Sequence, residues 1–324
     1  MSFNQYTWDL YKQTTIGIEM IKYFSDAGGY VLFKDYCPYA NFIPEDLYND
    51  WLENIYCYGV SDYDHPSSLE EAKDLYISLI TLGIRVEGQQ WLPANDFKNM
   101  LGIIQPMSYV LSQFAPEYFF PYLFLCRIFE LNKIADFFNI DLPNIPKRTD
   151  YKGRCMYYWE LCEVFYLFRK ENGLSPADLW SFLYDFAPNN LPSEKIDMPK
   201  PSQVWFIGGR LYQEDKSLES KFWQSSPETK KGDILVHYET SPISAITCIE
   251  ISLTDGVIDP LFRYYGCIYI GNRINIPHIT LKELQTDEYF FKHPLVRKNF
   301  QGVNGWSVNS ENYSELLRMI KTKG

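Results

Sequence analysis

The residues with the clearest capacity for chemistry lie together at the end of a predicted strand. An apolar run at 234–236 leads into His237 and Tyr238, and Thr240 and Ser241 follow shortly after. An imidazole, a phenol and two hydroxyls can all take part in hydrogen bonds, so such a group could recognise the polar edge of a ligand. The alternative is that these residues only close the end of the strand.

The alternation of this strand predicts which side chains share a face. Ile234, Val236 and Tyr238 fall on one face, and Leu235 and His237 fall on the other. In a small closed barrel the β-branched face is expected to lie inside. We therefore expect Tyr238 to point into the mouth of the barrel and His237 to lie outside it, as structural support.

The sequence predicts no metal site and no bound cofactor. The histidines are far apart, and no two cysteines have the two-residue spacing of common zinc sites. No glycine-rich stretch has the spacing of a phosphate-binding loop. The four histidines are His65, His237, His278 and His293.

One group of residues has a spacing reminiscent of metal-dependent nucleases, namely Asp141, Asp150 and Lys152. Such nucleases need these groups on strands beside an upstream carboxylate, whereas here the three residues lie in a proline-rich loop. The N-terminal half therefore offers no usable catalytic constellation, and we expect a binding protein without catalytic residues.

The elements that must position the polar group divide the chain into three parts. Residues 1–187 have mainly helical periodicity, residues 188–203 hold four prolines, and residues 204–324 contain short strand-like runs. Proline removes a backbone donor and restricts the residue before it, so the middle part is expected to be an extended linker. The predicted fold class is α+β, a helical domain followed by a small, mostly antiparallel β-barrel.

Capping signals place several helix boundaries in the first part. Ser67 with Glu70, or Ser68 with Glu71, can open a helix that Gly83 ends. The expected buried face of this helix is Leu69, Ala72, Leu75, Tyr76, Leu79 and Ile80. The short run at 30–33 is expected to be a strand or a buried connector.

In the last part the strands are expected at 204–207, 234–238, 245–251 and 267–270. Helices are expected at 214–223, after the capping box that begins at Thr280, and at 311–321.

The charge is uneven along the chain, and this limits the class of partner. Residues 1–199 hold 15 Lys and Arg against 27 Asp and Glu, a net charge of −12, whereas residues 200–324 hold 15 against 14, a net charge of +1. Binding to duplex DNA usually depends on many cationic contacts with phosphates, so a chain of net charge −11 is a poor general DNA binder. The C-terminal half can still hold a local basic face.

Location is predicted from the cysteines and from the absence of targeting signals. Seven scattered cysteines do not indicate a disulfide framework, and no signal peptide is predicted at the N-terminus. The longest strongly apolar run, 118–126, is too short to span a bilayer. A cytoplasmic protein without membrane contact is expected.

The order of features after the linker resembles the EVE domain of the PUA-like superfamily, a relative of the YTH and ASCH domains. Trp205 in the first strand, the stretch KKGDILVHYETSPISAI at 230–246, VIDPLF at 257–262 and ITLKELQTDEYFFKHPLVR at 279–297 carry the resemblance. The terminal helix, with Tyr313, Leu316 and Leu317, fits as well. The resemblance covers residues 204–324 and implies a pseudo-β-barrel.

Domains of this family have a pocket that receives one flipped base, which is often modified. The resemblance therefore implies recognition of a modified or unpaired base in nucleic acid. It implies a pocket near Trp205, Trp223, His237, Tyr238 and the Thr240-Ser241 turn. Asp259, before Pro260, is most simply part of a turn and could also support the pocket. The alternative function is a protein-interaction scaffold whose acidic part, residues 1–187, docks a protein partner.

Overall fold

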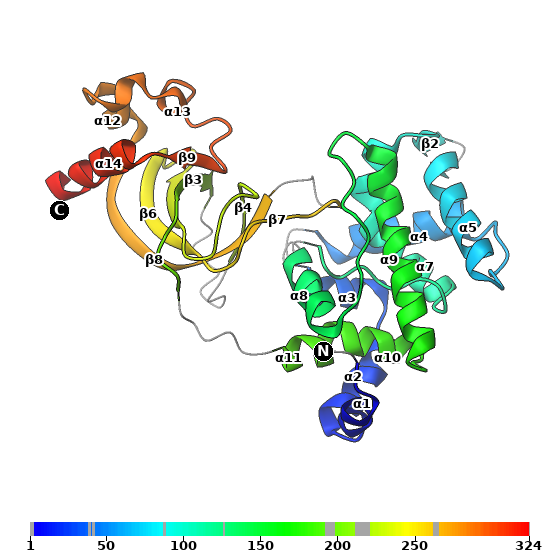
Figure 1. The fold of residues 1–324 in the computed structure, drawn as a ribbon. Coiled ribbons are helices and arrows are strands. Elements are labelled where there is room, and N and C mark those ends of the chain that lie inside the picture. The colour runs from blue at the N-terminus through cyan, green and yellow to red at the C-terminus, as the bar shows by residue number, and fades with distance from the viewer. Residues whose placement is uncertain are drawn as a thin grey trace. The chain divides into compact units, whose positions relative to one another are not determined.

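The computed structural model describes residues 3–37, 40, 43–86, 89–125, 127–191, 198–210, 221–261 and 266–323. The fold is mixed, with helices and a curled sheet (Figure 1). The chain divides into two compact units. The N-terminal unit comprises Met1–Ser193 and Pro260–Tyr264, and the C-terminal unit comprises Glu194–Asp259 and Tyr265–Gly324.

The N-terminal unit is mainly helical. Its α-helices are α1 Gln5–Lys12, α2 Thr15–Asp26, α3 Gly29–Tyr36, α4 Glu45–Ile55, α5 Leu69–Leu82, α6 Phe97–Met100, α7 Ile104–Phe114, α8 Ile128–Phe138, α9 Tyr151–Glu171, α10 Pro176–Ser181 and α11 Ala187–Asn190. The π-helical turns η2 Tyr56–Val60 and η4 Phe182–Phe186, the 3-10 turn η3 Leu101–Ile103 and the antiparallel strands β1 Ile84–Val86 and β2 Gln89–Leu92 complete it. Within the described ranges, no helix is both long enough and apolar enough to cross a membrane.

Helix α5 begins and ends where its sequence predicts. The Ser68 hydroxyl accepts a hydrogen bond from the Glu71 N–H, and the Glu71 carboxylate accepts one from the Ser67 N–H. Gly83, at φ +76°, ends the helix in a conformation that favours glycine. Most of the predicted inward face is buried, namely Ala72, Leu75, Tyr76, Leu79 and Ile80. These side chains add to a core rich in aromatic rings, which include Trp8, Tyr48 and Trp159.

Three expectations differ from the structure. The run at 30–33 lies inside helix α3. Helix α11 continues to Asn190, inside the range predicted to be linker, because Pro188 lies in its first turn, where no backbone donor is needed. Residues 192–197 of that range lie outside the described residues. Trp223 lies in a strand and not at the end of a helix, and residues 214–220 of that predicted helix also lie outside them.

The C-terminal unit is built on one curled sheet (Figure 1). Its strands are β3 Val204–Gly209, β4 Lys221–Ser225, β5 Ile234–Glu239, β6 Ala245–Ser252, β7 Val257–Ile258, β8 Gly266–Thr280 and β9 Trp306–Val308. The strand order is β4-β8-β6-β5-β3-β9, and β7 also pairs with β8. Strands β3 and β5 are parallel, and the other pairs are antiparallel.

The two faces of this sheet bury different side chains. The inner cluster comprises Trp205, Ile207, Leu235, Ile268 and Ile270, with the half-buried Trp223 against it. These residues come from strands that are not all neighbours in the sheet, so the cluster lies inside the curl. The outer cluster joins Phe206, Val236, Tyr238, Ile246 and Ile279 to apolar side chains from residues 284–316.

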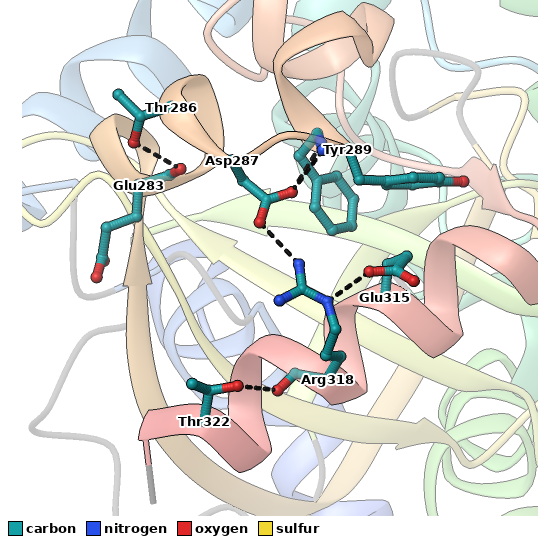
Figure 2. A network of polar contacts seen from close by, with 8 residues as sticks. Glu283, Thr286, Asp287, Tyr289, Glu315, Arg318 and Thr322 are labelled. Carbon is teal, nitrogen blue, oxygen red and sulfur yellow. Dashed lines mark hydrogen bonds and ion pairs between the residues drawn. The ribbon is translucent and has the colours of Figure 1, made fainter.

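Helices cover the outer face. They are α12 Leu281–Thr286, η5 Phe290–Lys292, α13 Pro294–Arg297 and α14 Ser310–Lys323. The Arg318 guanidinium joins α14 to the end of α12, because its Nη2 lies 2.8 Å from Asp287 Oδ2 while its Nε donates to Glu315 Oε2 at 2.6 Å (Figure 2). Asp287 Oδ1 accepts the backbone N–H groups of Tyr289 and Phe290, so this carboxylate also fixes the turn after α12 (Figure 2).

Candidate functional site

The inner face of strands β5 and β6 brings three chemically capable side chains together. His237 pairs with Cys248 across the two strands, and Leu235 pairs with Glu250. Directly paired residues of antiparallel strands share a face, as do residues two apart on one strand. His237, Cys248 and Glu250 therefore lie on the face of the inner cluster, and all three are buried.

Glu250 has both carboxylate oxygens engaged. Its Oε2 lies 3.0 Å from His237 Nδ1, and its Oε1 accepts a hydrogen bond from Arg273 Nε at 2.8 Å. Burial acts to raise the pKa of Glu250, but the hydrogen bond from His237 and the Arg273 charge outweigh burial and hold that pKa below its ordinary value. Glu250 is therefore a carboxylate at neutral pH.

The other nitrogen of His237 has an unmet hydrogen-bonding capacity. Nε2 is buried and has no hydrogen-bond partner among the residues that the structure describes. A buried polar atom without a partner costs free energy, about 1–3 kcal/mol, unless a ligand or water satisfies it. The Trp223 indole packs edge-on against the imidazole, with ring centroids 4.7 Å apart. A half-buried aromatic ring and an unsatisfied nitrogen thus lie side by side.

Contacts from β3 and from the segment before β9 position the Trp223 ring. Its Nε1 lies 3.3 Å from Asn304 Oδ1, which also accepts a hydrogen bond from the Gly208 N–H at 2.7 Å. At Gly209 a Cβ atom would lie 2.5 Å from Trp223 Cζ2, so only glycine allows this close approach. Gly209 therefore leaves the space that the Trp223 ring occupies, and the Gly208 N–H helps to hold Asn304 in place.

Trp205 is positioned by a buried carboxylate. Its Nε1 donates to Asp233 Oδ2 at 2.9 Å, and the same oxygen accepts the Lys230 N–H. Asp233 Oδ1 accepts the N–H groups of Ser202 and Gln203. Burial acts to raise the pKa of Asp233, and these hydrogen bonds outweigh burial and lower it. Trp205 is only 6% exposed and packs within the inner cluster, so its role is to support the inner face.

Tyr238 lies on the other face of the sheet, in contrast to the expectation from alternation. Its ring stacks on Phe300 in the outer cluster. The predicted grouping of side chains is right, but the Val236 and Tyr238 face packs under the helices, and the Leu235 and His237 face lies inside the curl. One pocket cannot be lined by both Trp205 and Tyr238.

The remaining predicted residues lie at the ends of strands. Thr240 is half-buried and Ser241 is exposed in the turn after β5, where the Thr240 N–H donates to the Gly209 carbonyl. Asp259 is fully buried after β7. It lies close enough to Cys267 for its charge to act, after burial, to raise the pKa of that thiol.

The buried triad also has the donor types of a metal site. One ligand atom from each of His237, Cys248 and Glu250 lies within 4.8 Å of the others. Cys248 would have to lose a proton to bind a metal ion, and burial raises the pKa of its thiol to about 12. Because His237 and Arg273 already engage both Glu250 oxygens, the arrangement is a hydrogen-bonded network in which Nε2 is the available atom.

Sequence reasoning missed Glu250, Arg273 and Asn304. Glu250 had a visible signal, because it is a charged residue within the apolar run at 245–251, on the face shared by Cys248. Arg273 and Asn304 had none, because each reaches the site from a part of the chain distant in sequence.

Comparisons with known proteins leave the family open. No protein-family model matches the chain, and no curated protein matches it. The chain is similar to a solved structure, the NMR structure of Rpa0253 from Rhodopseudomonas palustris, at 13% sequence identity and a TM-score of 0.32. The match covers 38% of this chain and 95% of that one, and at this TM-score it has no weight for fold or function.

Proposed function

We propose that the C-terminal unit is an EVE-type, PUA-like module that binds a modified or unpaired base of a nucleic acid. The inner face of the sheet is the proposed site, with Trp223 and His237 in contact with the base. Trp205, Asn304 and Glu250 position these two residues. The observation that carries the proposal is the pairing of the half-buried Trp223 ring with the unsatisfied His237 Nε2.

A nucleobase matches this pair of groups. Its flat face can stack on an indole, which contributes about 1–3 kcal/mol per base in single-strand binders. Its edge has N–H and carbonyl groups, which a buried imidazole nitrogen can meet with one hydrogen bond. An unpaired base has its face and its Watson–Crick edge exposed, whereas a base within a duplex has both covered.

Exposed cations on the outer segments of the same unit favour a polyanionic ligand. Lys282, Lys292, Arg297 and Lys298 are exposed, and none has an ion pair within the described residues. The nearly neutral balance of residues 200–324 therefore includes a short basic run at 292–298, which holds Lys292, Arg297 and Lys298 and no acidic residue. Such a run can contact backbone phosphates without recognising the base sequence.

The test is binding of the full-length chain to short single strands that contain one modified cytosine or adenine, measured by calorimetry. Trp223→Ala is expected to lower affinity about tenfold or more, since a stacking surface is lost. Phe222→Ala is the matched control, because Phe222 is a half-buried aromatic residue of the same strand on the opposite face. No binding by the wild-type chain at tens of micromolar would exclude the proposal.

A second candidate function belongs to the N-terminal unit, where an open groove of about 380 Å³ lies between α4 and α7. It is lined by Leu52, Glu53, Tyr56, His65, Tyr109, Val110, Gln113 and Phe114. Residues 45–74, which supply half of this lining, hold nine acidic residues and one lysine. An aromatic groove in acidic surroundings suits a basic side chain of a protein partner, because aromatic faces and carboxylates both attract cations.

The scaffold candidate is tested by capture of a protein partner that resists nuclease treatment. Tyr56→Ser should abolish capture, since Tyr56 lines the groove and is 46% exposed. Tyr58→Ser is the matched control, because Tyr58 lies in the same π-helical turn, is 40% exposed and does not line the groove. Equal loss of capture with both variants would contradict a role for the groove.

A further inference from the structure

The Glu250 carboxylate determines which nitrogen of His237 holds the proton. A carboxylate has no proton to donate, so the 3.0 Å contact between Glu250 Oε2 and His237 Nδ1 requires a proton on Nδ1. Arg273 engages the other oxygen, Oε1, from 2.7–2.8 Å, which fixes the orientation of the carboxylate. The proton position is therefore built into the network before any ligand binds.

The charges of this network balance without a charged imidazole. Glu250 contributes one negative charge and Arg273 one positive charge. A second proton on His237 would add an unbalanced positive charge at a fully buried position, which is costly. In the neutral imidazole with its proton on Nδ1, Nε2 has a free lone pair. That nitrogen is an acceptor only.

We propose that His237 Nε2 accepts a hydrogen bond from the exocyclic amino group of the bound base, so that the site selects a base with at least one amino N–H, which adenine, cytosine and guanine have and uracil and thymine lack. This inference rests on the proposed function and adds the chemical class of the ligand. A monomethylated amino group keeps one N–H and is still bound. A dimethylated amino group has none, and it leaves Nε2 without a partner.

The Trp223 ring controls access to this acceptor. Nε2 is buried, and the indole that packs on the imidazole is half-buried. For a base to reach Nε2, the indole must shift away from the imidazole, and its face can then stack on the base. Uracil and thymine fit less well, because their ring N–H is flanked by two carbonyl oxygens that would face the same lone pair.

The substitution Glu250→Gln tests the proposal by reversing the proton position. Arg273 donates to Oε1 in the wild type, so the glutamine oxygen is expected to remain with Arg273 and the amide NH₂ to face Nδ1. Nδ1 must then accept, and the proton moves to Nε2, which becomes a donor. The variant keeps the shape of the site and reverses the polarity of one atom.

The measurement is the affinity of the full-length chain for two otherwise identical single strands, one with N6-methyladenine and one with N6,N6-dimethyladenine. The same pair is made for N4-methylated cytosine. The wild type is expected to prefer the monomethylated base by about tenfold, as for one buried hydrogen bond lost. In Glu250→Gln this ratio is expected to fall to about one, because the donor can meet the ring nitrogen acceptor of either base.

Each outcome decides a separate point. A wild-type ratio near one with both base types, alongside clear binding, overturns this inference and leaves the proposed function standing. Absence of binding to every strand overturns the proposed function as well. If Glu250→Gln does not fold, imidazole nitrogen NMR of the wild-type chain at neutral pH decides the proton position. A proton on Nε2 of His237 in that spectrum overturns the inference.

Discussion

Tyr238 and Phe300 stack face to face, with ring centroids 4.0 Å apart and ring planes within 3° of parallel. This contact joins β5 to the segment after α13, so the residue that follows His237 in the chain belongs to the helix-packed side of the sheet. The two neighbours therefore have separate roles. His237 is buried on the inner face, where we propose that the ligand binds, and Tyr238 stabilises the fold.

Tyr238→Phe should lower the free energy of unfolding by about 1 kcal/mol or less, because only the hydroxyl is lost while the ring still packs on Phe300. Tyr238→Ala should cost about 3–5 kcal/mol, as for other large buried rings. Chemical denaturation measures both values. Oligonucleotide affinity should be unchanged in Tyr238→Phe, and a loss of affinity without a loss of stability would place the ligand on the outer face.

Asp233 should make the stability of the C-terminal unit depend on acid pH. Its pKa is lower in the folded chain than the ordinary value of 3.8, so its contribution to stability is present above that value and is lost as the pH falls through the folded pKa. Asp233→Asn should cost about 2–4 kcal/mol at pH 7, because the amide NH₂ cannot accept the hydrogen bonds that the carboxylate oxygens receive.

Thermal unfolding between pH 7 and pH 2.5 checks this prediction. The melting temperature of Asp233→Asn should fall less steeply with decreasing pH than that of the wild type. Asp255→Asn is the control, because Asp255 is 58% exposed and its carboxylate contacts the Lys230 ammonium and accepts the Lys231 N–H at the surface, where an asparagine oxygen can still accept. That control should change stability by less than about 1 kcal/mol. Similar losses in both variants would contradict the assigned role of the buried carboxylate.

Local signals in the sequence predict much of the secondary structure. The Ser68 and Glu71 cap, the Gly83 stop and the box formed by Thr280 and Glu283 all form as expected. Each of these depends on residues three or four positions apart, so no long-range contact is needed to recognise it.

The candidate site could be predicted only in part, for a physical reason. Alternation groups Leu235 with His237, but it cannot say which face of β5 receives the helices. That choice depends on apolar side chains from residues 284–316, which pack on Val236 and Tyr238. Glu250, which bonds His237, and Arg273, which bonds Glu250, come from β6 and β8, whose register includes bulges that local sequence does not specify.

Glu283 should make a second contribution to stability that is lost at acid pH. Hydrogen bonds from Lys323 and from Thr280 lower the pKa of its carboxyl from 4.5 to about 2. Because the folded pKa is depressed, the stabilisation is present above pH 4.5 and is lost as the pH falls toward 2. The side chain is 40% exposed, so solvent screening limits the effect to about 1 kcal/mol or less.

Glu283→Gln should therefore lower the unfolding free energy slightly at pH 7 and leave it unchanged at pH 2. Urea denaturation at the two pH values measures the difference. Glu288→Gln is the control, since Glu288 is exposed and lies in the turn after the same helix. A larger loss at pH 2 than at pH 7 would contradict the predicted sign.

The exposed cations between 282 and 298 should set the salt dependence of nucleic-acid binding. Each phosphate contact with a single strand contributes about 0.7 to the slope of log affinity against log salt concentration. The triple variant Lys292→Gln, Arg297→Gln and Lys298→Gln should therefore reduce that slope by about 2 if all three residues contact phosphates.

The same variant separates contacts to phosphates from recognition of the base. Phosphate contacts do not depend on the base, so affinity should fall by a similar factor for every oligonucleotide, and the ratio between monomethylated and dimethylated bases should stay as in the wild type. Lys321→Gln is the matched control, because it removes one exposed charge from the end of α14. Fluorescence anisotropy titrations between 50 and 200 mM salt, roughly the range over which such slopes are resolved, measure both quantities. An unchanged slope in the triple variant would show that the nucleic-acid backbone takes another path across the unit. A changed ratio between the affinities for monomethylated and dimethylated bases would show that these cations reach the base itself.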